Sequence, residues 1–324
     1  MTETRRLGRT DIEITPVGLG CWQLAGRGPA GWVYPAIGVE TATAIVRAAI
    51  EGGVNWFDTA EMYGGGQSER TLASALRDAG IEPWRVVIAT KWNPLFLRSA
   101  ASISRTFGAR TEALQGYPID LHQIHMPWGS LSTHKAQLRE MAGLLRARKI
   151  RAIGVSGFSA QQMTEASDLL AAEGMVLASN QVEISLVQRK IERDGVLAAA
   201  RKLGVTLIAF SPLRSGLLTG RFHDDPGAVA SLPRMRRMLG LGSYSAVSLA
   251  KTRPLIDELG RIAAAYSVSR AQVALNWLIS FYGETVVAIP GASRLEQAVE
   301  SAAAMSFRLT DPELARLDEL SRQT

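Results

Sequence analysis

The chain has 324 residues, an ordinary length for one α/β barrel and enough to bury a large core. Its net charge of +6 comes from basic residues that are dispersed along the chain, which argues against nucleic acid as a partner. A single cysteine, Cys21, excludes an intrachain disulfide and a cysteine-based zinc site, and the four histidines form no convincing ligand set, so we expect no metal. No apolar run approaches a membrane span and the start lacks an apolar signal core, so we expect a soluble, cytoplasmic protein without a membrane partner.

Strand-like and helical patterns alternate along the chain after a plausible hairpin over residues 4–16. Strand-like runs occupy residues 17–22, 54–58, 86–90, 121–125, 152–156, 177–181, 206–211 and 286–290. Helical patterns occupy residues 40–51, 69–79, 135–148, 160–172, 192–202, 254–266 and 295–304, and a last helix fits 311–320. Good N-cap residues precede several of these helices, namely Ser68, Ser159, Ser293 and Thr310.

This alternation predicts parallel strands joined by right-handed crossovers. A closed (β/α)8 TIM barrel with an N-terminal β-hairpin fits best, as a single domain over residues 1–324. An open doubly wound sheet is the alternative, but Gly18-Leu19-Gly20-Cys21-Trp22-Gln23 does not give its Gly-rich dinucleotide fingerprint. The segment 213–251 is too long for a barrel connection, so the strand near 206–211, the seventh, is followed by a long loop that resembles a functional lid.

Three consecutive predicted strands end on chemically active side chains. Asp58 ends one, Lys91 follows the next and His125 ends the third, while Tyr63 lies on the loop after Asp58. A tyrosine can act as a general acid if a nearby lysine ammonium lowers its pKa from about 10. Because the active sites of such barrels lie at the carboxyl ends of the strands, these four residues form a candidate catalytic site.

Large apolar side chains lie at or beside the same strand ends. We expect Trp22, Trp92, Met126 and Trp128 to line an apolar substrate pocket. His122 lies three residues before His125 on the same strand, so it should point the other way.

Several short motifs recur in order at the strand ends. They are Phe57-Asp58-Thr59-Ala60 with Tyr63-Gly64 and Gln67-Ser68-Glu69, Thr90-Lys91, Gln123-Ile124-His125, Gly154-Val155-Ser156, Asn180-Gln181-Val182-Glu183, Ser211-Pro212-Leu213 and Ile289-Pro290-Gly291. With this order and spacing the chain resembles the aldo-keto reductase family over almost its whole length. The resemblance implies that the chain binds NADPH extended across the barrel rim, without a Rossmann fold, and reduces an aldehyde or ketone to an alcohol.

The resemblance also implies a role for each matching residue. Tyr63 would donate the proton, Lys91 would lower the pKa of Tyr63, Asp58 would hold Lys91 charged, and His125 would orient the carbonyl oxygen. For the cofactor, Ser156 and Gln181 would hold the carboxamide and Phe210 would stack on the nicotinamide. The remaining cofactor residues would be Ser211, Leu213 and Gly216 at the pyrophosphate, Pro290 and Gly291 at the end of the eighth strand, and Gln297 and Ser301 near the adenine.

Three positions depart from the family pattern. Gly157 stands where the family usually has Asn, Gly291 where Lys often follows Pro290, and Ser301 where Asn is usual. Arg294 then becomes the best candidate for the 2′-phosphate of NADPH, because a guanidinium offers a fork of donors that suits phosphate.

Two other functions compete with carbonyl reduction. One is an NADP(H)-sensing regulatory subunit with little turnover, although the sequence shows no obvious docking patch for a partner protein. The other is an aldolase with Lys91 as a Schiff base, which the neighbouring Asp58 disfavours because a paired lysine stays protonated. The sequence makes no prediction of the particular substrate or of the oligomeric state.

Overall fold

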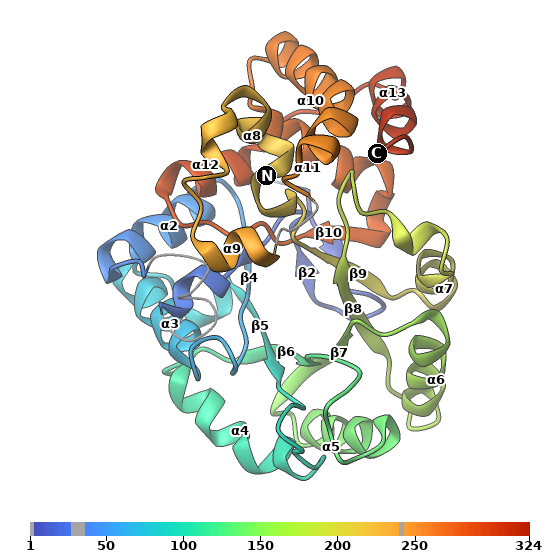
Figure 1. Ribbon diagram of the computed structural model, residues 1–324. Coiled ribbons are helices and arrows are strands. Elements are labelled where there is room, and N and C mark those ends of the chain that lie inside the picture. Colours follow the sequence, from blue (N-terminus) through green and yellow to red (C-terminus); the bar gives the residue numbers. More distant parts are fainter. Residues whose placement is uncertain (1–2, 27–35, 240–242) are drawn as a thin grey trace.

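Eight parallel strands form the centre of the structure (Figure 1). The computed structural model describes residues 3–26, 36–239 and 243–324. The strands are β3 (Leu19–Gly20), β4 (Trp56–Asp58), β5 (Val87–Trp92), β6 (Ile119–Ile124), β7 (Ile150–Ser156), β8 (Leu177–Glu183), β9 (Thr206–Phe210) and β10 (Val286–Ala288). Each pairs with the next in chain order. Backbone hydrogen bonds from Gly18 to Ala288 (2.8 Å) and from Gly20 to Pro290 (3.0 Å) join β3 to β10, so the sheet closes into the predicted barrel.

Helices surround the barrel (Figure 1). They are α2 (Val39–Glu51), α3 (Gln67–Asp78), α4 (Ser102–Ala113), α5 (His134–Arg146), α6 (Ala160–Ala171), α7 (Val196–Leu203), α8 (Arg221–Asp224), α9 (Arg234–Leu239), α10 (Ala246–Tyr266), α11 (Arg270–Phe281), α12 (Leu295–Ala303) and α13 (Asp311–Ser321). Their apolar faces pack on the outward-facing side chains of the strands in one large core. Among the described residues, none of these helices has both the length and the apolar character needed to cross a membrane.

The predicted N-terminal hairpin consists of β1 (Arg5–Arg6) and β2 (Glu13–Ile14), which pair antiparallel. Leu7, Ile12 and Ile14 from this hairpin are buried in a second core with inward-facing residues of the barrel strands. The Arg5 guanidinium donates to the backbone carbonyls of Ile279, Gly283 and Val286, at 2.7 to 2.8 Å. The hairpin therefore covers the inner core of the barrel and is tied to the connection that leads into β10.

Two crossover helices were missing from the sequence prediction. Helix α4 carries Ser, Thr and Gly in its interior, residues that weaken a helical pattern. Helix α11 is buried on most of its surface, so it lacks the one-sided apolar stripe that marks a surface helix. A capping box at Ser269 and Gln272 does mark the start of α11 and could have revealed it.

The segment after the seventh barrel strand also differs from the prediction. It is not one long loop, because η4 (Arg214–Thr219), α8, η5 (Pro226–Ala228) and α9 lie within it. Helix α10 begins at Ala246 rather than Pro254, and Pro254 lies inside it. Ser159 and Thr310 cap their helices as predicted, whereas Ser68 lies inside α3 and the N-cap of α12 is Arg294 rather than Ser293.

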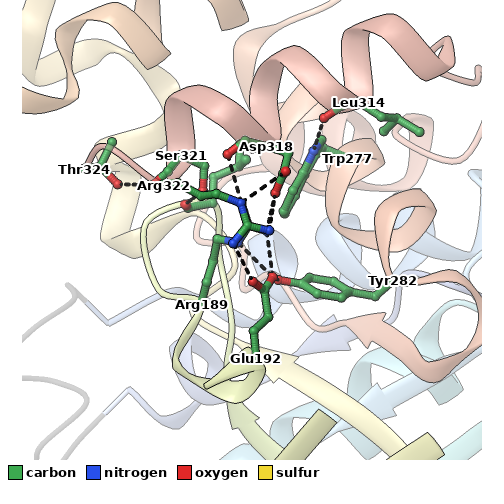
Figure 2. Close-up of polar contacts among 10 residues, drawn as sticks. Arg189, Glu192, Trp277, Tyr282, Leu314, Asp318, Ser321, Arg322 and Thr324 are labelled. Carbon is green, nitrogen blue, oxygen red and sulfur yellow. Dashed lines mark hydrogen bonds and ion pairs between the residues drawn. The ribbon is translucent and has the colours of Figure 1, made fainter. Parts of the chain in front are cut away.

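A buried arginine fastens the C-terminal helix to the barrel. Figure 2 shows the Arg189 guanidinium between the carboxylates of Glu192 and Asp318, with Trp277 beside it. Arg189 also donates to Ser321 Oγ (3.0 Å), and its Cζ lies 5.1 Å from the ring centroids of both Trp277 and Phe281. One side chain therefore joins the loop after β8 to α11 and α13 through ion pairs, a hydrogen bond and stacking.

Replacing Arg189 by lysine should lower the stability of the protein by about 1–3 kcal/mol, because an ammonium can neither reproduce the fork of donors nor stack on the rings. The midpoint of urea unfolding measures the loss. Arg316→Lys is the matched control, since Arg316 forms an exposed ion pair with Glu319 one turn along α13 and should change stability by less than about 0.5 kcal/mol. Equal midpoints for the two variants would contradict this account of Arg189.

Candidate active site

A cavity of about 460 Å³ lies at the carboxyl ends of the barrel strands. Residues of β3, β4, β7, β8 and β9 and of the segments that follow β3, β4, β6, β9 and β10 contribute to its wall. The lining residues are Gly20, Cys21, Trp22, Gln23, Asp58, Tyr63, His125, Ser156, Gln181, Phe210, Ser211, Pro212, Leu213, Ser215, Gly216, Thr219, Ile289, Pro290, Gly291, Ser293 and Gln297. Most of the site residues that the sequence predicts at the strand ends thus line one cavity.

A buried ion pair lies at the base of this cavity. Lys91 Nζ is 2.5 Å from Asp58 Oδ1 and donates a second hydrogen bond to the backbone carbonyl of Thr59 at 2.9 Å. The other carboxylate oxygen, Asp58 Oδ2, accepts from the side-chain amides of Gln123 (3.1 Å) and Gln181 (2.8 Å). Burial is the largest single influence on the pKa of Lys91 and lowers it, but the charge and hydrogen bond of Asp58 together with those of Tyr63 outweigh burial, and the pKa ends above its ordinary value. Lys91 is therefore an ammonium ion.

Tyr63 stands next to this pair. Its hydroxyl oxygen is 3.4 Å from Lys91 Nζ, and three glycines with left-handed backbone, Gly64, Gly65 and Gly66, turn the chain from Tyr63 into α3. Burial raises the pKa of Tyr63, and the Lys91 charge opposes that rise without cancelling it. This corrects the expectation that Lys91 brings the pKa below its ordinary value, because desolvation is the larger effect. Tyr63 consequently keeps its proton at neutral pH.

His125 lies beside Tyr63 in the wall of the cavity, and the edge of one ring meets the face of the other with centroids 5.5 Å apart. Burial and then the Lys91 charge lower the pKa of His125 well below its usual range, so the imidazole is neutral. His122 points the other way, as expected from strand alternation, and its ring meets Phe107 of α4 at 5.6 Å. The two histidines of one strand thus have different environments, one in the cavity and the other in the outer core.

The prediction of a four-residue apolar pocket needs correction. Trp22 lines the cavity, and its ring centroid is 6.5 Å from that of Tyr63. Trp92 does not, because it directly follows the inward-facing Lys91 and therefore points outward, where its Nε1 donates to Ser102 Oγ of α4. Met126 and Trp128 are also outside the cavity lining, and Trp128 is 63% exposed on the loop after β6.

The residues expected to hold a cofactor mostly gather in the same cavity. Nine of them line it, namely Ser156, Gln181, Phe210, Ser211, Leu213, Gly216, Pro290, Gly291 and Gln297. Phe210 is 37% exposed although it ends a barrel strand, so its ring presents a bare apolar surface. Arg294 and Ser301 lie outside the lining: Arg294 is exposed at the start of α12, between the lining residues Ser293 and Gln297, and Ser301 is buried in that helix.

Gln23 and Gln123 are polar residues of the site that the strand-end argument missed. Gln123 faces the barrel interior and supports Asp58, and its position two residues before His125 was the signal for an inward-facing side chain. Gln23 lines the cavity, and its buried Oε1 has no hydrogen-bond partner among the described residues. A Cβ on Gly291 would lie 2.2 Å from this oxygen, so the glycine at 291 leaves the room that Gln23 occupies.

Comparison with known proteins identifies the family. A model of the Aldo/keto reductase family matches residues 16–322, and the chain belongs to this family of oxidoreductases. An uncharacterized oxidoreductase of Mycobacterium tuberculosis is 36% identical over 313 residues, which are 96% of this chain and 90% of the relative. The glycerol dehydrogenase of Gluconobacter oxydans superimposes with a TM-score of 0.84 at 27% identity, covering 99% of this chain and 96% of its own. An aldo-keto reductase from Klebsiella pneumoniae in complex with NADPH superimposes with a TM-score of 0.72 at 27% identity, and the match covers 100% of this chain and 96% of the Klebsiella chain.

The environment of His122 predicts a pH dependence of stability. Burial lowers the pKa of His122 to about 3, and both ring nitrogens are buried without a partner among the described residues. The unfolded chain takes up a proton near pH 6.5 that the folded chain does not bind until about pH 3, so stability is complete above pH 6.5 and falls as the pH drops through that window.

We therefore expect the wild type to lose about 2 kcal/mol more stability than His122→Phe when the pH falls from 7 to 5. Phenylalanine has no proton to bind in either state and can pack against Phe107. Urea unfolding of both proteins at the two pH values measures the difference, and other titrating groups cancel because the two chains share them. If both proteins lost the same stability between pH 7 and pH 5, His122 would not be the source of this pH dependence.

Proposed function

We propose that this protein reduces an aldehyde or ketone to an alcohol with NADPH, and that Tyr63 supplies the proton. The carrying observation is the Tyr63 hydroxyl, which lies 3.4 Å from Lys91 Nζ and lines the same cavity as His125. Such a group can protonate a carbonyl oxygen as the carbon is reduced.

The cavity fits NADPH in the chemistry of its lining. The bare face of Phe210 suits the nicotinamide ring, and Ser156 and Gln181 suit its carboxamide. The Gln181 amide nitrogen already donates to Asp58, which leaves the amide oxygen to accept from the carboxamide. Ser211, Leu213 and Gly216 would contact the pyrophosphate, Arg294 the 2′-phosphate, and Gln297 with Ser301 the adenine end.

In the proposed reaction, bound NADPH supplies the hydride that adds to the carbonyl carbon. The carbonyl π electrons move to the oxygen, which takes the Tyr63 proton, and the neutral His125 ring holds that oxygen by donating its single N–H. The phenolate that remains is stabilised by the Lys91 ammonium, which Asp58 keeps in place. Solvent then returns a proton to Tyr63.

Tyr63→Phe should lower kcat for reduction of 4-nitrobenzaldehyde by about a hundredfold or more, because the reaction loses its general acid. Loss of NADPH absorbance measures the rate, and quenching of tryptophan fluorescence should show an unchanged affinity for NADPH. Tyr266→Phe is the matched control, since its phenol is hydrogen-bonded to Arg308 and Glu313, outside the cavity lining, and should keep full activity. A Tyr63→Phe enzyme that retains more than about a tenth of the wild-type rate would refute the role of Tyr63.

Arg294→Ala should raise KM for NADPH about tenfold to hundredfold and leave KM for NADH unchanged, because only NADPH carries a 2′-phosphate and a charged hydrogen bond of this kind contributes about 1.5–3 kcal/mol. Initial rates with the two cofactors give the ratio. Arg105→Ala serves as the control, since Arg105 is an exposed arginine of α4 outside the cavity lining. If both KM values changed equally, Arg294 would not distinguish the two cofactors.

A further inference from the structure

Glu61 is a buried carboxylate on the loop between Asp58 and Tyr63, and the reaction described above does not use it. It lies outside the cavity lining, so it meets neither substrate nor cofactor there. Its contacts instead connect the Tyr63 loop to the strand that carries Lys91.

The main-chain hydrogen bonds between β4 and β5 continue beyond the end of β4 as far as Glu61, where a side chain takes over. The Thr59 N–H donates to the carbonyl of Ala89 (2.8 Å), and two residues later the Glu61 N–H donates to the carbonyl of Lys91 (3.2 Å). The chain then turns away, and the Glu61 carbonyl accepts instead from Gly66 (2.7 Å). The next strand donor, the Asn93 N–H, is satisfied by Glu61 Oε1 at 2.5 Å. A side-chain carboxylate therefore replaces the missing main-chain acceptor.

Two arginines provide the opposite charge that this buried carboxylate requires. Arg98 forms an ion pair with Glu61 Oε1, and it also donates to Ser102 Oγ (3.2 Å) and Thr106 Oγ1 (2.9 Å) in the first turns of α4. Arg110 Nε lies 3.9 Å from Glu61 Oε2. Glu61 is thus bound on one side by the end of β5 and on the other by α4.

We propose that Glu61 is a positioning residue that holds the Tyr63 hydroxyl against Lys91. Its N–H donates to the Lys91 carbonyl and its carboxylate accepts from the Asn93 N–H, so the two bonds flank Trp92 and fix the Tyr63 loop in register with the strand that carries Lys91. The inference rests on the proposed role of Tyr63 as proton donor. For this role the length of the Glu61 side chain, which lets it reach the Asn93 N–H, matters more than the charge of its carboxylate.

Reach and charge can be separated with two conservative variants. Glu61→Gln keeps the length and an acceptor oxygen for Asn93, and we expect kcat within about threefold of wild type. Glu61→Asp keeps the charge but withdraws the carboxylate by one methylene, and we expect kcat to fall about tenfold or more, because misplacement of a reacting group by about 1 Å is costly. The basic limb of the pH profile of Glu61→Asp should move to higher pH, since the Lys91 charge then opposes the effect of burial on Tyr63 less strongly.

The affinity for NADPH, measured by fluorescence quenching without turnover, should be unchanged in both variants. Glu192→Asp is the matched control: this carboxylate also accepts from an arginine and a further side chain, Arg189 and Tyr282, but outside the cavity lining. It should lower the unfolding midpoint and leave kcat unchanged. A Glu61→Asp enzyme as active as Glu61→Gln, or an equal loss of kcat in Glu192→Asp, would overturn the inference. If instead Tyr63→Phe retains its rate, the proposed function itself fails whatever the Glu61 variants do.

Discussion

The buried ion pair between Lys91 and Asp58 imposes the strongest constraint on the interior of this barrel. Removing two charges from water costs several kcal/mol per ion, and this cost is offset only when the remaining hydrogen-bonding capacity of both groups is satisfied. Here the Asp58 carboxylate has three side-chain donors, Lys91, Gln123 and Gln181, and the ammonium also reaches the Thr59 carbonyl. Strands β4, β5, β6 and β8 must therefore each place a polar side chain inward at one level. The inner core below that level, between the hairpin and the strands, is apolar.

The regular alternation of strands and helices explains why much of the fold, and the meeting of the candidate site residues at one rim, could be predicted from the sequence. Polar residues at the ends of short buried runs stand out, and parallel strands must bring those ends to one rim, so Asp58, Lys91 and His125 were recognisable before any contact was known. The alternation of side chains along a strand explains why the prediction for Trp92 was wrong. Its position beside Lys91 suggested that it lines a pocket, but strand alternation places it in the outer core against α4.

Other features depend on contacts that a single sequence does not express. In the sequence Glu61 is an ordinary acidic residue of a loop. Its contact with Asn93 exists only because the chain turns away and leaves the Asn93 N–H without a main-chain acceptor. Helix α11 has no exposed residue because its neighbours enclose it, so its sequence lacks the one-sided apolar pattern that marks a surface helix. Arg189 contacts Ser321, which lies more than a hundred positions later in the chain. In each case tertiary structure decides what the local pattern leaves open.

The charge on Lys91 influences the protonation of both neighbouring groups of the site. Burial lowers the pKa of His125 most and the Lys91 charge adds to that effect, which keeps the imidazole neutral, while the same charge opposes the burial that raises the pKa of Tyr63. The opposition is incomplete, so the phenol still holds its proton. In the proposed reaction this balance is what a proton donor requires: burial keeps the proton on Tyr63 until the carbonyl oxygen gains negative charge, and the ammonium then stabilises the phenolate. A lysine held charged by Asp58 can perform both tasks, whereas a neutral amine could perform neither.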